Sequence, residues 1–267
     1  MEPLVATLPA KRVPQWVRNH FNQTLDTHQS LFDLIGISRS GVAMLVTMPK
    51  VVRYLAETDG KGDHPATKLQ IEDAEKRAEL AKQELSEDFP VLHALAVVQT
   101  WSMTENLIKG LLTHWIINHK DSYALPAIHK LRIRLGEFVN QSEIEQAEYV
   151  VELLEQDLGS TFKGGVQRFE SMLQPFSLSG PVPDECSKVM FELQHVRNSI
   201  AHRNGIVDRR LRDACPWLAM PTGTRLRVSR VMLAGYASAA IEYLLMVLYR
   251  VGDTYGVDRP PSSERPT

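Results

Sequence analysis

The feature that most constrains the fold is a nineteen-residue stretch, Val231 to Tyr249, that carries a single charge, Glu242. A helix of this length is long enough to cross a bilayer, but a carboxylate in the middle of such a span is costly. Gly235 and three tyrosines within the stretch favour close packing against protein. We therefore expect a helix buried in a bundle, with Ser229 as its N-cap. A membrane span is the alternative.

Most of the remaining sequence also has helical periodicity, with apolar residues three and four positions apart. Prolines, glycines and short polar stretches divide it into segments. The sequence thus predicts an all-α protein, an up-and-down helical bundle with an N-terminal helical extension. Helices are expected at 16–35, 39–56 (bent or split at Pro49), 69–85, 91–118, 126–138, 143–158, 162–173, 184–204 and 231–249.

Changes in composition suggest where the chain divides. A loop rich in glycine and charge lies between an N-terminal helical extension (1–60) and a charged linker helix, and the loop and linker together cover 61–88. Pro90 begins the bundle (89–252), and a tail rich in proline and serine (253–267) is expected to be disordered. A heptad stripe on the linker helix predicts packing against one close neighbour, within the chain or across a dimer. Its members are Ile71, Ala74, Ala78, Ala81 and Leu85.

Composition also disfavours several classes of protein. Two cysteines, Cys186 and Cys215, are too few for a disulfide framework or a zinc site. The chain does not open with a cationic leader and an apolar run, so we expect a cytoplasmic protein. The glycine motifs of dinucleotide-binding proteins and of serine hydrolases do not occur. We expect neither a metal nor a cofactor.

The most informative motif is Arg197-Asn-Ser-Ile-Ala-His202, which precedes Asn204-Gly-Ile-Val-Asp208. An arginine can hold a phosphodiester bidentately and offset the charge that develops on it. A histidine titrates near neutrality and can move a proton to or from an oxygen. With RNA the nucleophile would be the substrate's own 2′-hydroxyl. These residue types are therefore sufficient for RNA cleavage without a metal.

The motif lies near the end of an expected amphipathic helix that starts at Asp184, its expected N-cap, and stops at Asn204-Gly205 in the left-handed conformation. At about 100° per residue, Arg197 and His202 are roughly 140° apart around the axis. Either the long arginine reaches round to the histidine, or the partner histidine comes from another chain. We favour the second arrangement.

The motif and its surroundings resemble the HEPN superfamily (higher eukaryotes and prokaryotes nucleotide-binding). The matching residues are Arg197, Asn198 and His202, followed by Asn204 to Asp208. The resemblance covers about residues 90 to 250. It includes an earlier apolar helix that carries Glu105 and a short strand-like segment, Leu226 to Ser229, before the final helix.

The resemblance implies a bundle of four or five helices and, for many members, a metal-independent endoribonuclease that dimerises to build one composite cleft. Such members act as toxins or host-defence effectors, and a nucleotidyltransferase-like antitoxin is a possible partner. The resemblance also implies roles for particular residues. Arg197 would contact the scissile phosphate, His202 would act as acid or base, and Asn198 would orient or stabilise the transition state. Glu105 would be a further catalytic residue.

Charge is distributed unevenly along a chain whose net charge is −2. Residues 197 to 230 contain eight arginines, no lysine and two aspartates, whereas residues 137 to 157 contain seven acidic residues and no basic one. The arginines indicate either a phosphate-facing surface or a solvated face paired with the acidic run. The candidate RNA-binding residues are Arg203, Arg209, Arg210 and Arg212.

Two functions therefore remain open. The first is a metal-independent endoribonuclease, a toxin or host-defence effector with RNA as its substrate. The second is a non-catalytic HEPN-type bundle that binds a protein or a nucleotide. In a purely structural reading of the motif, Arg197 pairs with a carboxylate on a neighbouring helix, and His202 in the last turn interacts with the helix dipole.

Overall fold

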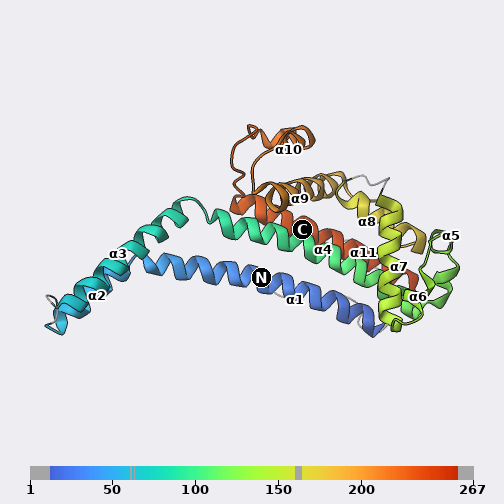
Figure 1. The fold of residues 1–267 in the computed structure, drawn as a ribbon, viewed down its shortest axis with the longest axis horizontal. Coiled ribbons are helices and arrows are strands. Elements are labelled where there is room, and N and C mark those ends of the chain that lie inside the picture. The colour runs from blue at the N-terminus through green and yellow to red at the C-terminus, as the bar shows by residue number, and fades with distance from the viewer. Residues whose placement is uncertain (1–12, 61, 63, 160–163, 258–267) are drawn as a thin grey trace.

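The computed structural model describes residues 13–60, 62, 64–159 and 164–257, and over these residues the protein is an all-α helical bundle (Figure 1). The helices are α1 (Gln15–Leu45), α2 (Met48–Thr58), α3 (Pro65–Ser86), α4 (Pro90–Asn118), α5 (Pro126–His129), α6 (Leu135–Phe138), α7 (Glu143–Leu158), α8 (Val166–Leu173), α9 (Asp184–Arg203), α10 (Arg209–Ala214) and α11 (Arg230–Thr254), with 3-10 turns η2 (Lys120–Ala124), η4 (Gln174–Phe176) and η5 (Pro216–Leu218).

The centre of the bundle is α4, which contacts α1, α7, α9 and α11. Burial extends along the whole helix, from His93 to Ile116, because apolar side chains occur on every side of it. The stretch expected to lie in a bundle forms α11, which packs on both α4 and α9. As expected, its N-cap is Ser229, whose hydroxyl accepts a hydrogen bond from the Met232 amide at 3.2 Å. By length and composition α11 is able to cross a membrane, but 50% of its most apolar window is buried inside the protein.

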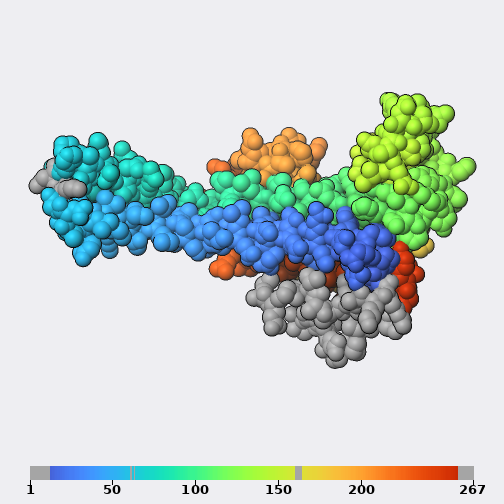
Figure 2. Space-filling model, turned by 90° about the horizontal axis from the view of Figure 1, so that it is seen from below, coloured from blue at the N-terminus to red at the C-terminus, as the bar shows by residue number. Residues whose placement is uncertain are grey.

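The first helix belongs partly to the bundle and partly to an arm. Near its start, Val17 and Phe21 are buried in the core, and His20 contacts the main-chain oxygen of Leu107 through Nε2 at 2.8 Å. Its far half continues beyond the bundle and forms, with α2 and α3, an arm that projects at one end of the molecule (Figures 1 and 2).

The break expected between residues 35 and 39 is wrong, because α1 is continuous from Gln15 to Leu45. Gly36 and Gly41 lie within it, and a glycine lowers helix stability without ending the helix. The chain instead bends by 48° between α1 and α2, and Pro49 then occupies the first turn of the new helix, where a proline is tolerated. The expected split at Pro49 is thus displaced by a few residues.

The charged linker helix, α3, packs within the chain through the alanines of its heptad stripe, but against two helices instead of one, and Leu85 of the stripe is exposed. Ala74, Ala78 and Ala81 are buried, and α3 contacts α1 and α2 of the same chain. Between α3 and α4 the chain turns through Asp88 and Phe89, which adopt positive φ angles of 56° and 55°. Asp88 fixes this turn, since it accepts hydrogen bonds from Arg39 at 2.8 Å and from the Arg230 amide at 3.0 Å.

Two other expectations are corrected. The segment 126–138 forms two single-turn helices, α5 and α6, instead of one helix. The chain leaves the helix at Lys130 and forms a helix again only from Leu135. The strand-like segment at Leu226 makes no strand among the described residues, where the β-structure is a single bridge between Ile206 and Arg225.

The chain ends differ from the expected boundaries as well. The last helix extends to Thr254, beyond the expected start of the tail at 253, and the next residue, Tyr255, contacts His119 at 3.0 Å. The rest of the tail from 258, like residues 1–12 of the N-terminal extension, lies outside the described residues.

Candidate active site

The motif occupies the last two turns of α9, and hydrogen bonds fix the way this helix ends. Asn204 adopts the left-handed conformation with φ 52°, as the Asn-Gly sequence predicts. The Gly205 amide then donates to the carbonyl of Ser199 at 3.1 Å. The buried Ser199 hydroxyl donates to the carbonyl of Ile206 at 2.9 Å. At the other end the helix starts at Asp184, but the N-cap position is Pro183 and no side chain caps it, so the expected Asp184 cap is wrong.

The structure brings three motif side chains together within one chain. Nη1 of Arg197 donates to Oδ1 of Asn198 at 3.1 Å and lies 3.5 Å from Nε2 of His202. The arginine therefore reaches round the helix, which is the arrangement that we did not favour. The angular argument failed because it considered only the direction in which each side chain leaves the helix, and an arginine side chain is long enough to bend back.

The contact between Arg197 and His202 places a donor group beside an imidazole. A guanidinium has donors and no acceptor, so this contact is a hydrogen bond in the tautomer whose Nε2 is free to accept. His202 is exposed and Asn198 is half-buried. The imidazole of His202 thus lies beside a cation at a solvent-accessible helix end.

Arg197 has an unusual electrostatic environment. Its side chain is half-buried, and Nε is buried without a hydrogen-bond partner. Among the described residues, no carboxylate lies within 4.0 Å of its guanidinium. A buried charge is normally paired. The pairing with a neighbouring acid that a structural role would require is therefore not observed in this part of the chain.

Glu105 has a different setting from the motif. It forms an ion pair with Arg168 of α8 at 2.8 Å and another with Lys109 at 3.4 Å. Glu155 of α7 joins the same cluster, with Lys109 at 2.8 Å. Burial raises the pKa of Glu155, but bonds from Lys109 and Arg168 outweigh this effect, and the pKa lies below its ordinary value. The structure thus places Glu105 in a four-residue ion-pair cluster and does not bring it to Arg197.

The four arginines proposed to bind RNA lie at and after the end of α9. Arg203 pairs with Asp208 at 3.6 Å, and Arg212 pairs with Asp213 at 2.7 Å. Arg209 and Arg210 are exposed in the first turn of α10 and, among the described residues, have no carboxylate within 4.0 Å.

The acidic run does not neutralise the arginine-rich run. In the residues that the structure describes, the ion-pair partners of the acidic run are Lys120, Lys109, Arg168, Lys130 and Arg134, all of which lie outside 197–230. The arginine-rich surface around the motif is therefore not tied to the acidic run.

A feature that sequence reasoning missed is Trp217 in η5. Its side chain is 44% exposed, whereas Trp101 and Trp115 are buried as packing residues, as expected. Its Nε1 donates to Glu192 of α9, and the ammonium of Lys188 lies 5.2 Å from its ring centroid. The segment around it has no periodic pattern, so only the structure reveals that it returns to α9.

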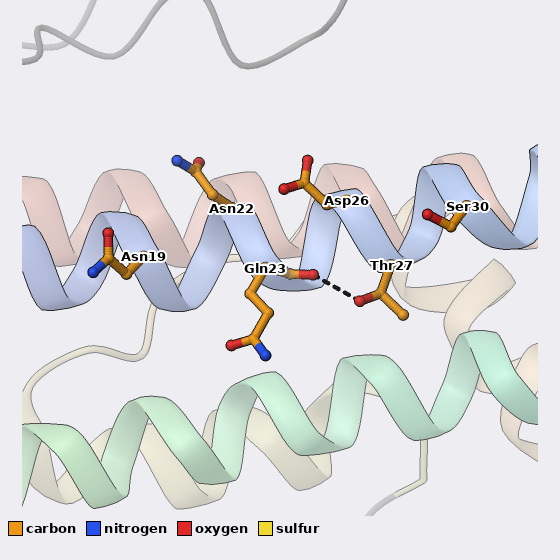
Figure 3. Close-up of a pocket in the computed structure, with 6 residues that line it drawn as sticks. All are labelled: Asn19, Asn22, Gln23, Asp26, Thr27 and Ser30. Carbon is orange, nitrogen blue, oxygen red and sulfur yellow. Dashed lines mark hydrogen bonds between the residues drawn. The ribbon is translucent and has the colours of Figure 1, made fainter.

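Two of the hollows on the described surface are large, and neither of these contains the motif. One of about 540 Å³ is formed by the segment that follows the motif helix, between Val207 and Pro221. Another of about 570 Å³ is lined by side chains of α1 alone, Asn19 to Ser30, one of which, Thr27, bonds the main chain of Gln23 (Figure 3). A surface made by one helix lacks the converging groups of a catalytic site. Among the described residues, no three His, Cys, Asp or Glu side chains are grouped as metal ligands.

Comparison with known proteins gives no relative: no family model matches this chain, and no curated protein or solved structure matches it.

Proposed function

We propose that this protein is a metal-independent endoribonuclease of the HEPN type, acting in the cytoplasm as a toxin or host-defence effector. The observation that supports it most is the Arg197 guanidinium, which has no carboxylate partner among the described residues and contacts Asn198 and His202 at a solvent-accessible helix end. A phosphodiester anion would supply the missing negative charge.

The proposed reaction uses Arg197, Asn198 and His202 together with one further proton carrier. The 2′-hydroxyl oxygen of the RNA attacks the adjacent phosphorus, and the bond from phosphorus to the 5′ oxygen breaks. The products are a 2′,3′-cyclic phosphate and a 5′-hydroxyl. His202 takes the proton from the 2′ oxygen or delivers one to the 5′ oxygen, and the other transfer uses water or a second histidine. Arg197 offsets the charge on the phosphoryl oxygens, with Asn198 orienting it.

The direct test is RNA cleavage in EDTA by wild type, Arg197→Ala and His202→Ala. We expect wild type to cleave single-stranded or loop RNA, and both variants to lose at least about 100-fold in rate. Circular dichroism and thermal melting check that the variants are folded. Intact RNA with wild type across a range of sequences would refute the nuclease proposal.

We also propose a homodimer, in which a second copy brings its own motif to the cleft. Because Arg197 and His202 of one chain are already in contact, the dimer rests on the HEPN resemblance and not on their angular separation. Mixing Arg197→Ala with His202→Ala subunits should restore part of the activity if the site uses both chains. Confirmed heterodimers without activity would show that each site belongs to one chain.

A second candidate function, a non-catalytic binding module, is favoured by the arm. Several large apolar side chains are exposed there, among them Ile37 and Tyr54 at 69% and Met44 at 67%. Exposed apolar surface of this kind is typical of protein-binding sites. A partner protein is the ligand that this surface fits, and binding without RNA cleavage would favour this function over the first. A nucleotidyltransferase-like antitoxin is the partner that we propose for the first function, the toxin.

A further inference from the structure

We infer that Trp217 is a stacking platform for an unpaired RNA base, positioned along α9 a few nucleotides from the phosphate held by Arg197. This inference rests on the proposed RNA substrate and specifies its class as single-stranded. Aromatic side chains on which bases stack, beside cations that follow the backbone, are the usual means of binding single strands.

The first step of the argument concerns how Trp217 is held. Its indole Nε1 donates to Oε2 of Glu192, and Oε1 of the same carboxylate accepts a hydrogen bond from the Tyr236 hydroxyl at 2.7 Å. Tyr236 is fully buried in α11. The ring is thus fixed to the bundle through Glu192 while 44% of the side chain remains exposed. A large aromatic surface fixed in this way loses little conformational freedom when a base stacks on it.

The second step concerns direction along the helix. Four side chains of α9 lie within about 80° of one another at about 100° per residue. They are Lys188, Glu192, His195 and His202. None of the four is fully buried. The residue that holds Trp217 and the catalytic histidine therefore lie on one accessible face of the same helix.

The third step concerns distance. Ten residues separate Glu192 from His202, which corresponds to about 15 Å along the axis at 1.5 Å per residue. Stacked nucleotides rise about 3.4 Å each along a strand, so this length corresponds to about four nucleotides. A strand with its scissile phosphate at Arg197 can therefore reach Trp217 within a short oligonucleotide.

Charge supports the same path. The Lys188 ammonium lies over one face of the Trp217 ring, 5.2 Å from its centroid, so a base stacks on the opposite face or displaces this cation towards a phosphate. The segment that carries Trp217 also carries α10, which projects on one side of α9 in Figure 1 and whose first turn exposes Arg209 and Arg210. Cationic and aromatic groups thus occur together only a few turns from the motif.

The experiment uses the tryptophan itself as the probe. Trp217 is the most exposed of the four tryptophans, since Trp101 and Trp115 are buried and Trp16 is half-buried. A short oligouridylate with 2′-O-methyl groups is titrated into the wild-type protein, so that no cleavage occurs. The fluorescence attributable to Trp217 is the difference between wild type and Trp217→Phe, and we expect the single strand to quench it.

Affinity supplies the second readout. We expect Trp217→Ala to bind the oligonucleotide about 5-fold to 100-fold more weakly than wild type, with Trp217→Phe in between, because Phe keeps an aromatic face but loses the bond to Glu192. Tyr54→Ala, which removes an exposed aromatic ring from the arm, is the matched control and should bind as wild type does. Equal quenching by a duplex of the same length, or wild-type affinity of Trp217→Ala, would overturn the inference.

Failure of the platform and failure of the nuclease are distinguishable. Quenching and a weakened Trp217→Ala variant, without cleavage of ordinary RNA in EDTA, would support the platform and refute the nuclease. Cleavage in EDTA that is lost in His202→Ala but unchanged in Trp217→Ala, with no quenching, would retain the nuclease and overturn the platform.

Discussion

Two half-buried arginines, Arg168 of α8 and Arg197 of α9, have opposite environments in the same bundle. Arg168 contacts two carboxylates, Glu105 and Glu155, which Lys109 also contacts. Arg197 has, among the described residues, no carboxylate within 4.0 Å and contacts an amide and an imidazole instead. A sequence shows two arginines of equal charge, and only the structure shows that their surroundings differ.

Under the proposed function, the difference separates an arginine that stabilises the fold from one that binds the substrate. The charge of Arg168 is offset inside the protein, where it joins α4, α7 and α8. Under the proposed function, the charge of Arg197 is offset by an RNA phosphate, because no carboxylate lies within 4.0 Å of its guanidinium among the described residues. Sites of this kind often trade stability for function.

The largest expected effect is on catalysis. Arg197→Ala should reduce RNA cleavage by about 100-fold to 1,000-fold, the usual loss when one group that stabilises transition-state charge is removed. Arg168→Ala should retain the wild-type rate, because its partners lie in a separate cluster. Rates are compared at a temperature where both variants are folded. Equal losses of cleavage rate in the two variants would show that the two arginines do not differ in their effect on catalysis.

Stability should show the reverse order. Arg168→Ala leaves Glu105 and Glu155 with Lys109 alone, and we expect it to lower the free energy of unfolding by about 2 kcal/mol, or Tm by about 5 °C. Arg197→Met should leave Tm unchanged or raise it, since it removes an unpaired buried donor. Thermal melting by circular dichroism measures both. A larger loss in Arg197→Met than in Arg168→Ala would mean that Arg197 is structural.

Anion binding sharpens the comparison further. Inorganic phosphate at ten times its Kd should stabilise wild type by about 1.4 kcal/mol, because a ligand that binds only the folded state adds to stability. Arg197→Ala should lose this increment and Arg168→Ala should keep it. Sodium chloride at matched ionic strength is the control. Equal stabilisation of all three proteins would indicate binding elsewhere.

The smallest expected effect is a pH dependence. Interactions with Lys109 and Arg168 hold the pKa of Glu155 below its ordinary value. The ionised cluster therefore contributes stability above the ordinary glutamate pKa and loses it as the pH falls through the lowered value. Acid should destabilise wild type more than Glu155→Gln, as followed by urea unfolding between neutral and acidic pH. Parallel curves for the two proteins would contradict this account of the cluster.

Much of the fold follows from local sequence pattern. Most segments with helical periodicity form helices. The stretch from Val231 to Tyr249, which carries one charge, lies in α11, and Asn204 ends α9 in the left-handed conformation. Helix boundaries were less predictable where local signals compete. The glycines at 36 and 41 did not break α1, whereas the basic segment after His129 did not continue as a helix.

The site was harder to predict because its contacts depend on side-chain reach and on distant segments. The angle between Arg197 and His202 around the helix axis predicted that they do not meet, yet the long side chain of Arg197 reaches His202. Glu105 meets Arg168 across 63 positions of the chain, a pairing that no local pattern reveals. Trp217 returns to Glu192 across 25 positions through a segment without periodicity.

The most direct test of the central claim is cleavage in EDTA of one RNA oligonucleotide and of its 2′-deoxy counterpart. The account predicts that wild type cleaves only the RNA, that the products end in a 2′,3′-cyclic phosphate and a 5′-hydroxyl, and that His202→Ala leaves the RNA intact. Cleavage of both oligonucleotides, or cleavage of RNA that requires added metal, would contradict it.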